Sequence, residues 1–70
     1  MGVIAELEKN QKEKIRVSIE EYWGHKFIDL RVYFENENGE WKPSKKGIAL
    51  NRDCIFDVIK ALQRASKHRP

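Results

Sequence analysis

Apolar and polar residues alternate along two segments in the first half of the chain. The apolar positions are Ile15, Val17, Ile19 and then, further along, Ile28, Leu30, Val32 and Phe34. This period of two predicts half-buried strands, because successive side chains of a strand point to opposite faces of the sheet. We therefore predict a first strand that begins at Ile15 and a second over Phe27–Glu35, with a turn between them at Gly24 and His25.

Two shorter strands are predicted to follow. The Asn38-Gly39 pair favours a hairpin turn, because both residues tolerate a positive φ. A short third strand over Glu40–Lys42 and a short fourth strand over Ile48–Leu50 flank Ser44–Gly47, which we predict to be a turn or loop.

A helix is predicted for the C-terminal part, from about Arg52 to Ser66. Asn51 is a favourable N-cap residue, and Asp53 lies in the first turn, where the helix dipole favours an acidic side chain. The apolar residues at helical spacing are Ile55, Val58, Ile59 and Leu62. Phe56 lies off this stripe; a contact between two chains would explain it, and so would chance.

The fold class expected from these elements is α+β, a four-stranded antiparallel sheet followed by one C-terminal helix (ββββα). Residues 1–14 are an N-terminal extension to a domain over residues 15–70. In this extension, Ile4 and Leu7 could seed a short helix, or Val3–Glu8 could add a strand to the sheet and turn at Asn10-Gln11. We favour the additional strand.

The chain has 70 residues, of which 40% are apolar, so that its core is thin. A domain of this size buries only about 60% of the surface of its unfolded chain. Cys54 is the only cysteine, which excludes an internal disulfide. One cysteine and two histidines also fall short of a four-ligand zinc site, and we expect no metal and no cofactor. Dimerisation is therefore the expected source of added stability.

The apolar runs are shorter than the ~20 residues that a membrane span needs, and no secretory leader opens the chain. We expect a protein of a reducing, intracellular compartment: cytoplasmic and nucleoid-associated if the source is bacterial, nuclear if it is eukaryotic.

The formal net charge is +3 at pH 7, and part of the positive charge is concentrated in one stretch. The basic residues of the stretch that follows Trp41 are Lys42, Lys45, Lys46 and Arg52, with no acid among them. Such a stretch indicates an anionic partner, although ordinary solvated surface charge gives the same pattern.

Enzymatic chemistry finds little support in the sequence, and we expect no catalytic residues. Glu20 and Glu21 are adjacent, so that on a strand they point to opposite faces and do not form a carboxylate pair. The two histidines lie far apart, and Lys46-Gly47 lacks the surrounding pattern of a phosphate-binding loop.

Binding of single-stranded nucleic acid is better supported. If Ile28, Leu30 and Val32 face the helix, the outer face of the sheet displays Tyr22, Arg31 and Tyr33. Aromatic rings beside cations on an open sheet suit unpaired strands, because bases stack on the rings and cations neutralise phosphates. Antiparallel sheets nevertheless often carry mixed polar and aromatic residues on the outer face.

A family resemblance extends ungapped from about Lys14 to Leu62. Its residues are Val17-Ser18-Ile19, Ile28-Asp29-Leu30-Arg31, Tyr33, Gly39-Glu40, Lys42-Pro43-Ser44-Lys45-Lys46-Gly47-Ile48 and Leu50-Asn51. With them the chain resembles the C-terminal domain of the transcriptional coactivator positive cofactor four (the p15 family). The resemblance implies a homodimer paired through the helices, with channels for single-stranded DNA and little sequence preference. It also implies a role in transcription regulation or DNA maintenance, with the transcription machinery as a further partner. The start at Met1, without the serine-rich tail of eukaryotic members, suggests a minimal bacterial-type member.

The resemblance also implies which residues bind nucleic acid. They are Tyr22 and Phe34 as stacking rings, Arg31, Lys42, Lys45 and Lys46 as cations, and His25 with the neighbouring Lys26 at the first turn. Glu13 stands where the family has a basic residue, and Lys14 or Arg16 could substitute for it. Trp41 flanks the basic stretch and is counted as a further ring, with shielding of the sheet edge as its alternative role. The expected dimer interface is made by Ile55, Phe56, Ile59 and Leu62.

Phe34 presents a conflict, because it shares the parity of the buried residues whereas Arg31 has the opposite parity. A bulge or the end of the strand would have to reorient Phe34 for both to line one channel, and otherwise Phe34 is a core residue. We favour the channel.

The sequence leaves two other functions open. One is an RNA-binding module on the same sheet, since no residue separates RNA from DNA. The other is a protein-interaction module in which the basic stretch binds acidic segments of transcription partners.

Overall fold

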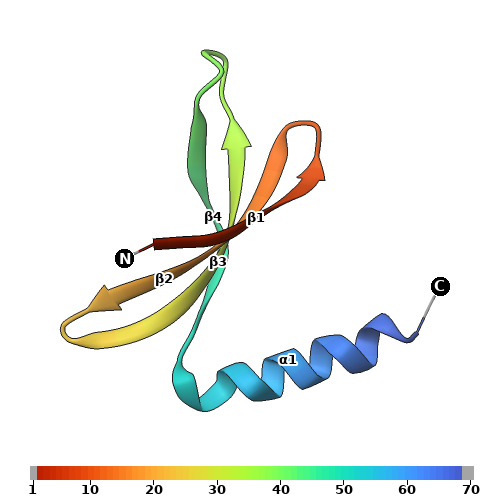
Figure 1. Ribbon diagram of the computed structural model, residues 1–70. Coiled ribbons are helices and arrows are strands. Elements are labelled where there is room, and N and C mark those ends of the chain that lie inside the picture. Colours follow the sequence, from red (N-terminus) through yellow and green to blue (C-terminus); the bar gives the residue numbers. More distant parts are fainter. Residues whose placement is uncertain (1, 69–70) are drawn as a thin grey trace.

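The computed structural model describes residues 2–68 and has four strands and one helix (Figure 1). The elements are β1 (Gly2–Asn10), β2 (Glu13–Tyr22), β3 (His25–Glu35), β4 (Trp41–Leu50) and α1 (Arg52–Ser66). The strands pair in chain order, and every pair is antiparallel. The predicted fold class, an α+β fold with a four-stranded antiparallel sheet and a C-terminal helix, is therefore confirmed.

The turn between β2 and β3 is a tight hairpin of two residues. Tyr22 pairs directly with His25, and Trp23 and Gly24 between them have φ values of 54° and 79°. Two successive positive φ values match the twist of the flanking strands, which is why such turns favour glycine. The turn leaves Trp23 in solvent, with 82% of the residue exposed.

The third and fourth strands predicted from the sequence are one continuous strand, β4, and the loop expected over Ser44–Gly47 is wrong. The pairing of β4 with β3 shifts from Pro43 opposite Tyr33 to Gly47 opposite Arg31. The residues between them therefore form a wide bulge rather than a turn. Pro43 fits β4 because this strand lies at the edge of the sheet, where a missing N–H is tolerated.

The N-terminal strand favoured from the sequence is present as β1, which pairs along β2. It completes the set of four strands, because β4 replaces the two short strands predicted after the hairpin. The turn that joins β1 to β2 is closed by Asn10, whose side-chain oxygen accepts a hydrogen bond of 2.9 Å from the Lys12 N–H.

The sheet has one apolar face and one polar face, as the register shows. Residues that pair directly share a face. The apolar face consists of Ile15, Val17, Ile19, Ile28, Leu30, Val32, Ile48 and Leu50. The polar face includes Lys14, Arg16, Ser18, Glu20, Tyr22, His25, Phe27, Asp29, Arg31, Tyr33 and Trp41.

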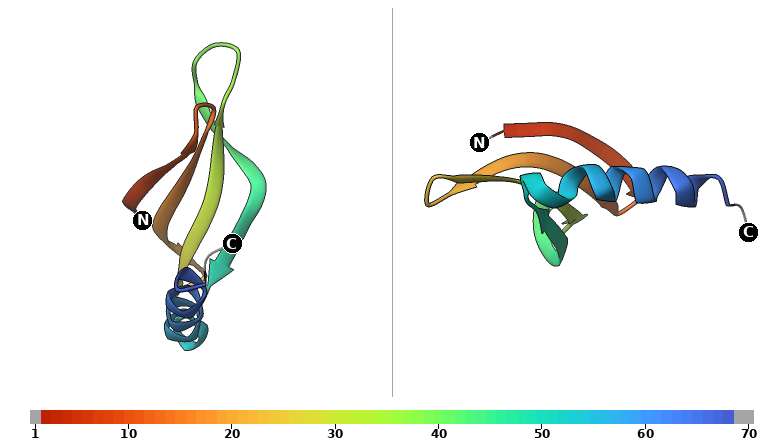
Figure 2. Two further views of the ribbon diagram at one scale, coloured as in Figure 1. Left: turned by 90° about the vertical axis from the view of Figure 1, so that its right-hand side faces the viewer. Right: turned by 90° about the horizontal axis from the view of Figure 1, so that it is seen from below.

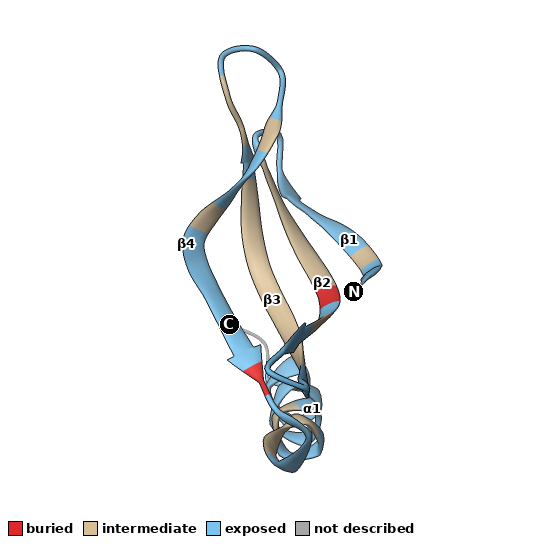
Figure 3. Cartoon of the chain, turned by 90° about the vertical axis from the view of Figure 1, so that its left-hand side faces the viewer, coloured by how far each residue is buried: buried red, intermediate tan, exposed pale blue. Residues whose placement is uncertain are grey.

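The helix covers only one end of the apolar face. Figures 1 and 2 show α1 leaving the sheet after β4 and extending beyond it. Ile55 and Phe56 in its first turns line a small apolar cleft with Ile28 and Leu50. Among the described residues, Leu50 is the one buried apolar residue, 3% exposed, and Ser18 on β2 is the one buried polar residue, as the red segments of Figure 3 mark. One chain alone therefore leaves most of its apolar face uncovered.

Candidate nucleic-acid interface

The polar face is hollowed at the end nearest the hairpin of β2 and β3. The hollow measures about 600 Å³ and is lined by Glu20, Glu21, Tyr22, His25, Phe27, Asp29, Arg31 and Ala49. Tyr22 stands at its rim with 68% of the residue exposed, and its ring meets the Trp23 ring edge-on at 5.9 Å between centroids. The hollow thus combines exposed aromatic surface with a fixed cation, Arg31.

Arg31 is held in place by two partners. Its Nε and Nη2 atoms each donate to a carboxylate oxygen of Asp29 at 3.1 Å, and its Nη1 atom donates to the Ser44 carbonyl at 3.0 Å. The hydrogen bonds to Asp29, and then its charge, raise the pKa of Arg31. These contacts use three of the five N–H groups of a guanidinium, so that two can still reach an anion.

Gly47 makes room for this arrangement. A Cβ atom on Gly47 would lie 2.7 Å from Cζ of Arg31 and 2.8 Å from the Leu30 carbonyl oxygen. Contacts this short do not occur between a side chain and a well-packed neighbour. The glycine is therefore required for the close approach of β4 to the Arg31 guanidinium.

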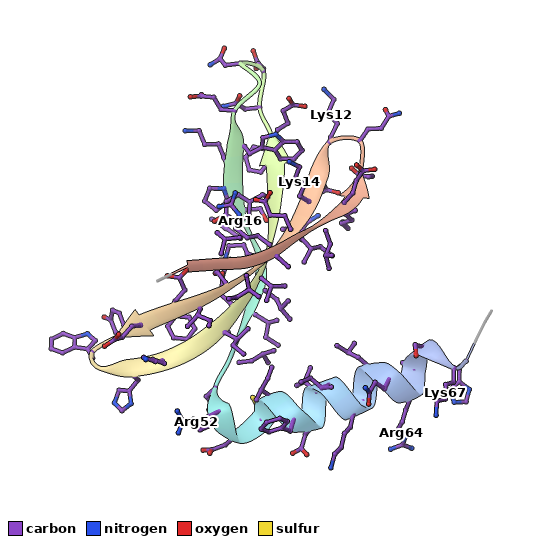
Figure 4. The ribbon with its side chains drawn as sticks, in the orientation of Figure 1. Lys12, Lys14, Arg16, Arg52, Arg64 and Lys67 are labelled. Carbon is purple, nitrogen blue, oxygen red and sulfur yellow. The ribbon has the colours of Figure 1, made fainter. Side chains whose placement is uncertain are left out.

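Two further cations of the polar face lie over aromatic rings. Cζ of Arg16 is 3.9 Å from the centroid of Tyr33, and Nζ of Lys14 is 4.3 Å from that of Trp41. Figure 4 shows Lys12 in the turn before β2, with Lys14 and Arg16 on β2, well apart from Arg52 and Arg64 on α1 and Lys67 just after its end. Sequence reasoning named Lys14 and Arg16 only as substitutes for a missing basic residue. It missed their pairing with rings, because Arg16 and Tyr33 are diagonal neighbours on β2 and β3, whereas Lys14 reaches across β3 to Trp41 on β4, and both contacts need the register to be known.

Arg16 has a carboxylate partner on β1. Its Nε atom donates to Oε2 of Glu6 at 2.8 Å, and its Nη2 atom lies 2.6 Å from the same oxygen. Partial burial works to lower the pKa of Arg16, but the bond to Glu6 and the proximity of Tyr33 outweigh it and the pKa is raised. Arg16 is therefore a permanent cation, fixed between a ring and a carboxylate.

The structure separates the predicted binding residues into three groups. Tyr22, His25 and Arg31 lie together at the hollow, and Trp41 lies further along the same polar face. Lys26 and Lys42 pair directly with Glu21 and Phe34, so that both belong to the side of the apolar face. Lys45 and Lys46 lie in the bulge of β4.

Phe34 is not reoriented towards the polar face. The pairing of β2 with β3 continues without a shift through Phe34 opposite Glu13, so the expected bulge at this residue is wrong. Phe34 therefore follows Leu30 and Val32 on the apolar face, 39% exposed, and does not share a local channel with Arg31. The register shift of β3 lies against β4 instead, where β4 carries the extra residues.

The bulge of β4 is built around the Ser44 hydroxyl. It donates to the Val32 carbonyl at 2.7 Å and accepts from the Lys46 N–H at 3.0 Å. Lys46 is also close enough to Glu13 to help lower the pKa of that carboxyl, although hydrogen bonds from Asn10 and Lys9 are the larger causes. Ser44 thus fixes the backbone that carries both bulge lysines and, through its carbonyl, Arg31.

The residues predicted for the dimer interface lie along α1. Ile55 is half-buried, whereas Phe56, Ile59 and Leu62 are 68%, 42% and 61% exposed.

Within residues 2–68, no group of three or more metal-ligating side chains is found. The one helix of this part of the chain is too short and polar to cross a membrane.

Comparisons with known proteins agree on one family. The model of a family described as Transcriptional Coactivator p15 (PC4) matches residues 9–61. The RNA polymerase II transcriptional coactivator SUB1 of Saccharomyces cerevisiae is 35% identical over 75 aligned residues, which cover 96% of this chain. The chain spans only 24% of the length of this curated relative.

Solved structures of similar proteins show the same fold. A PC4 homologue from Burkholderia pseudomallei superposes with a TM-score of 0.89 at 28% identity, covering 97% of this chain and 92% of that one. A bacteriophage T5 homologue of the eukaryotic coactivator PC4 gives a TM-score of 0.69 at 21% identity and covers 94% and 80%. The latter is described as implicated in recombination-dependent DNA replication, and at this identity only its fold is compared.

Proposed function

The chain belongs to the family of the transcriptional coactivator p15 (PC4), and from this premise we propose that it binds single-stranded DNA, without catalysis, as a homodimer. Its role would lie in transcription regulation or DNA maintenance, and the transcription machinery would be a further partner. Because the chain spans a quarter of the SUB1 protein, the activity of that whole protein is carried over only as part of this proposal.

The observation that carries the proposal is the hollow of the polar face. Tyr22 offers an exposed ring at its rim, and Arg31 offers two unused N–H groups from a fixed position. A base of an unpaired strand can stack on such a ring while its phosphate is bound by the guanidinium. Bases inside a duplex are stacked on one another and cannot reach Tyr22, which favours the single strand.

The bulge of β4 supplies a second group of contacts. Lys42, Lys45 and Lys46 are exposed, and Phe34 lies directly opposite Lys42 with 39% of its surface in solvent. We assign phosphate binding to the three lysines and stacking to Phe34 on this side of the sheet. Lys26 would add positive charge at the hairpin of β2 and β3, and the His25 ring would add a further polar contact there.

Dimerisation is supported by what a single chain leaves exposed. Leu50 is buried, but Phe56, Ile59 and Leu62 on α1 are exposed, as is Ile48 of the apolar face. A patch of this kind on a small protein usually marks an interface between chains. A second copy that places its helix on these residues would complete the core.

The proposal is tested by fluorescence anisotropy with labelled DNA, single-stranded and duplex, over a series of salt concentrations. We expect tighter binding of the single strand and a slope of log affinity against log salt that falls by about 0.7 for each phosphate contact removed. The variants are Arg31→Ala and the double variant Lys45→Ala/Lys46→Ala, with Lys60→Ala on α1 as the control. Equal affinity for both DNA forms, or no binding of either, would overturn the proposal.

A further inference from the structure

Four residues of the polar face form a cluster that the proposed site does not use as a unit. Arg16 lies over Tyr33 and Lys14 lies over Trp41, at 3.9 Å and 4.3 Å from the ring centroids. We call these two pairs the capped rings. They come from β2, β3 and β4, and they all lie on the face of the sheet away from the apolar residues.

The capped rings continue directly from the hollow. Arg16 pairs with Arg31 across β2 and β3, and Arg31 lines the hollow. Arg16 lies six residues before Tyr22 on β2, which corresponds to about 20 Å at 3.3 Å per residue. A strand that stacks on Tyr22 and passes Arg31 therefore reaches Arg16 next.

The chemistry of the capped rings suits an unpaired nucleic-acid strand. A guanidinium is planar, and bases stack on guanidinium planes as they do on aromatic rings. Arg16 is held over Tyr33 while 27% of its side chain remains exposed, so that its orientation is set before a ligand arrives. Lys14 and Arg16 also place two positive charges where a phosphate backbone would pass.

We propose that the capped rings are a second contact zone for the same single strand, which runs from Tyr22 past Arg31 to Arg16 and then to Lys14 and Trp41. The zone rests on the proposed function, because it extends that site along the polar face. In the free protein, Oε2 of Glu6 on β1 lies 2.6 Å from Nη2 of Arg16 and takes up part of its hydrogen-bonding capacity. This carboxylate competes with phosphate for Arg16. β1 thereby attenuates binding at the second zone.

The test measures DNA affinity in four variants of the full chain. Arg16→Gln removes the charge, and Arg16→Lys keeps the charge but removes the planar group. Glu6→Gln removes the competing carboxylate. Lys9→Gln is the matched control, because Lys9 is also an ion-paired cation of this sheet, bound to Glu13 at 3.0 Å, but it lies over no ring among the described residues.

The variants are expected to change the affinity for single-stranded DNA in opposite directions. With a single strand of about 20 nucleotides, Arg16→Gln should weaken binding by about 3–10-fold and lower the salt slope by about 0.7. Arg16→Lys should keep the slope and still bind more weakly. Glu6→Gln should strengthen binding by about 2–5-fold, because a charge that repels phosphate is gone. Lys9→Gln should match the wild type.

A direct readout comes from Trp41 in a Trp23→Phe background, where its fluorescence should change on DNA binding. If Arg16→Gln and Glu6→Gln bind like Lys9→Gln and Trp41 does not respond, while Arg31→Ala still weakens binding, the second zone is refuted and the proposed function stands. If Arg16→Gln does not fold by circular dichroism, Glu6→Gln decides alone, since a merely structural ion pair gives no gain in affinity. If no variant and no wild-type protein binds DNA, both proposals fail together.

Discussion

Arg31 shows how a single side chain of the polar face depends on its neighbours. Asp29 fixes two of its nitrogens, the Ser44 carbonyl fixes the third, and Gly47 leaves the space that the guanidinium fills. The ion pair with Asp29 leaves Arg31 oriented before any ligand binds, which lowers the conformational entropy that binding of the proposed DNA strand would otherwise cost. Gly47, which the sequence suggests is a loop residue, is thus needed in β4 because a larger side chain would overlap with Arg31.

Replacement of Gly47 should test this dependence. In Gly47→Ala the new Cβ atom would lie 2.7 Å from Arg31 and 2.8 Å from the Leu30 carbonyl, so that the guanidinium and the strand must shift. We expect a loss of stability of about 1–3 kcal/mol and weaker binding of single-stranded DNA. Thermal denaturation and anisotropy measure the two effects. Gly2→Ala is the control, because nothing lies within 4 Å of a Cβ atom there, and a Gly47→Ala variant as stable and as tightly bound as Gly2→Ala would contradict the account.

Tyr22 and Phe34 should act independently, because they lie on opposite faces of the sheet. We expect Tyr22→Ala to weaken binding by about 1–3 kcal/mol through lost stacking. The combination with Phe34→Ala should be additive within about 0.5 kcal/mol, as for residues without shared partners. A double-mutant cycle on DNA affinity measures this. A coupling clearly above that value would mean that both rings stack on the same bases.

At the scale of single elements, β4 is the strand whose irregularity bears on the proposed site. A regular strand would alternate Lys45 and Lys46 between the two faces, whereas the bulge removes them from the ladder and leaves both exposed. Bulges are common where a strand has to re-aim side chains at a site. The helix, in contrast, is regular: Asn51 caps it by accepting from the Cys54 N–H at 3.1 Å.

Loss of the Ser44 hydroxyl should disturb this bulge. Ser44→Ala removes the bond to the Val32 carbonyl and the acceptor for the Lys46 N–H, at an expected cost of about 1–2 kcal/mol. The salt slope of DNA binding should fall, because the bulge lysines are no longer held. Ser66→Ala is a matched control, since Ser66 makes a 2.7 Å bond to a carbonyl at the end of α1. An unchanged slope in Ser44→Ala would show that the bulge does not depend on this hydroxyl.

At the scale of the molecule, the two faces of the sheet carry different surfaces. The polar face carries the hollow and the capped rings, and the apolar face together with α1 carries the surface that a second chain would cover. This division would let a chain of 70 residues with so thin a core carry the proposed binding site. If two chains associate as proposed, folding and association are linked, and stability should depend on protein concentration.

A charge on the exposed side of α1 should therefore separate the chains. Leu62 is 61% exposed in one chain, and Leu62→Glu would bury a carboxylate in the proposed interface. We expect the variant to sediment as a monomer at micromolar concentration and to lose cooperative thermal unfolding. The control is Ala61→Glu, which changes the residue just before Leu62, outside the predicted interface, and should remain dimeric. A wild-type protein that sediments as a monomer would refute the homodimer.

The sequence predicts the regular elements well because their signals are local. Alternation places β2 and β3, and the N-cap at Asn51 places the start of α1 at the observed residue. The course of β4 is not predictable in this way. Pro43 and Gly47 resemble loop residues, whereas their tolerance depends on an edge position and on the approach of Arg31 from the neighbouring strand.

The site is predictable only in part, for the same physical reason. Tyr22 and Arg31 have the parity of the polar face, so that alternation finds them. The cation of Arg16 over Tyr33 depends on a diagonal contact across two strands, and no local pattern encodes it. Phe34 would face the polar side only if a bulge in β3 reoriented it. The pairing of β2 with β3 runs without a shift to Phe34 opposite Glu13, so Phe34 lies on the apolar face.

The most direct test of single-stranded DNA binding is a tryptophan-fluorescence titration of the wild-type protein with a mixed-sequence strand of about 20 nucleotides and with its duplex, at two salt concentrations. Trp23 lies beside Tyr22 at the rim of the hollow, and Trp41 lies at the capped rings, so that both report on the polar face. We expect strong, salt-sensitive quenching by the single strand and a clearly weaker response to the duplex. The absence of a response to either form, together with no change in the anisotropy of labelled DNA, would contradict the account.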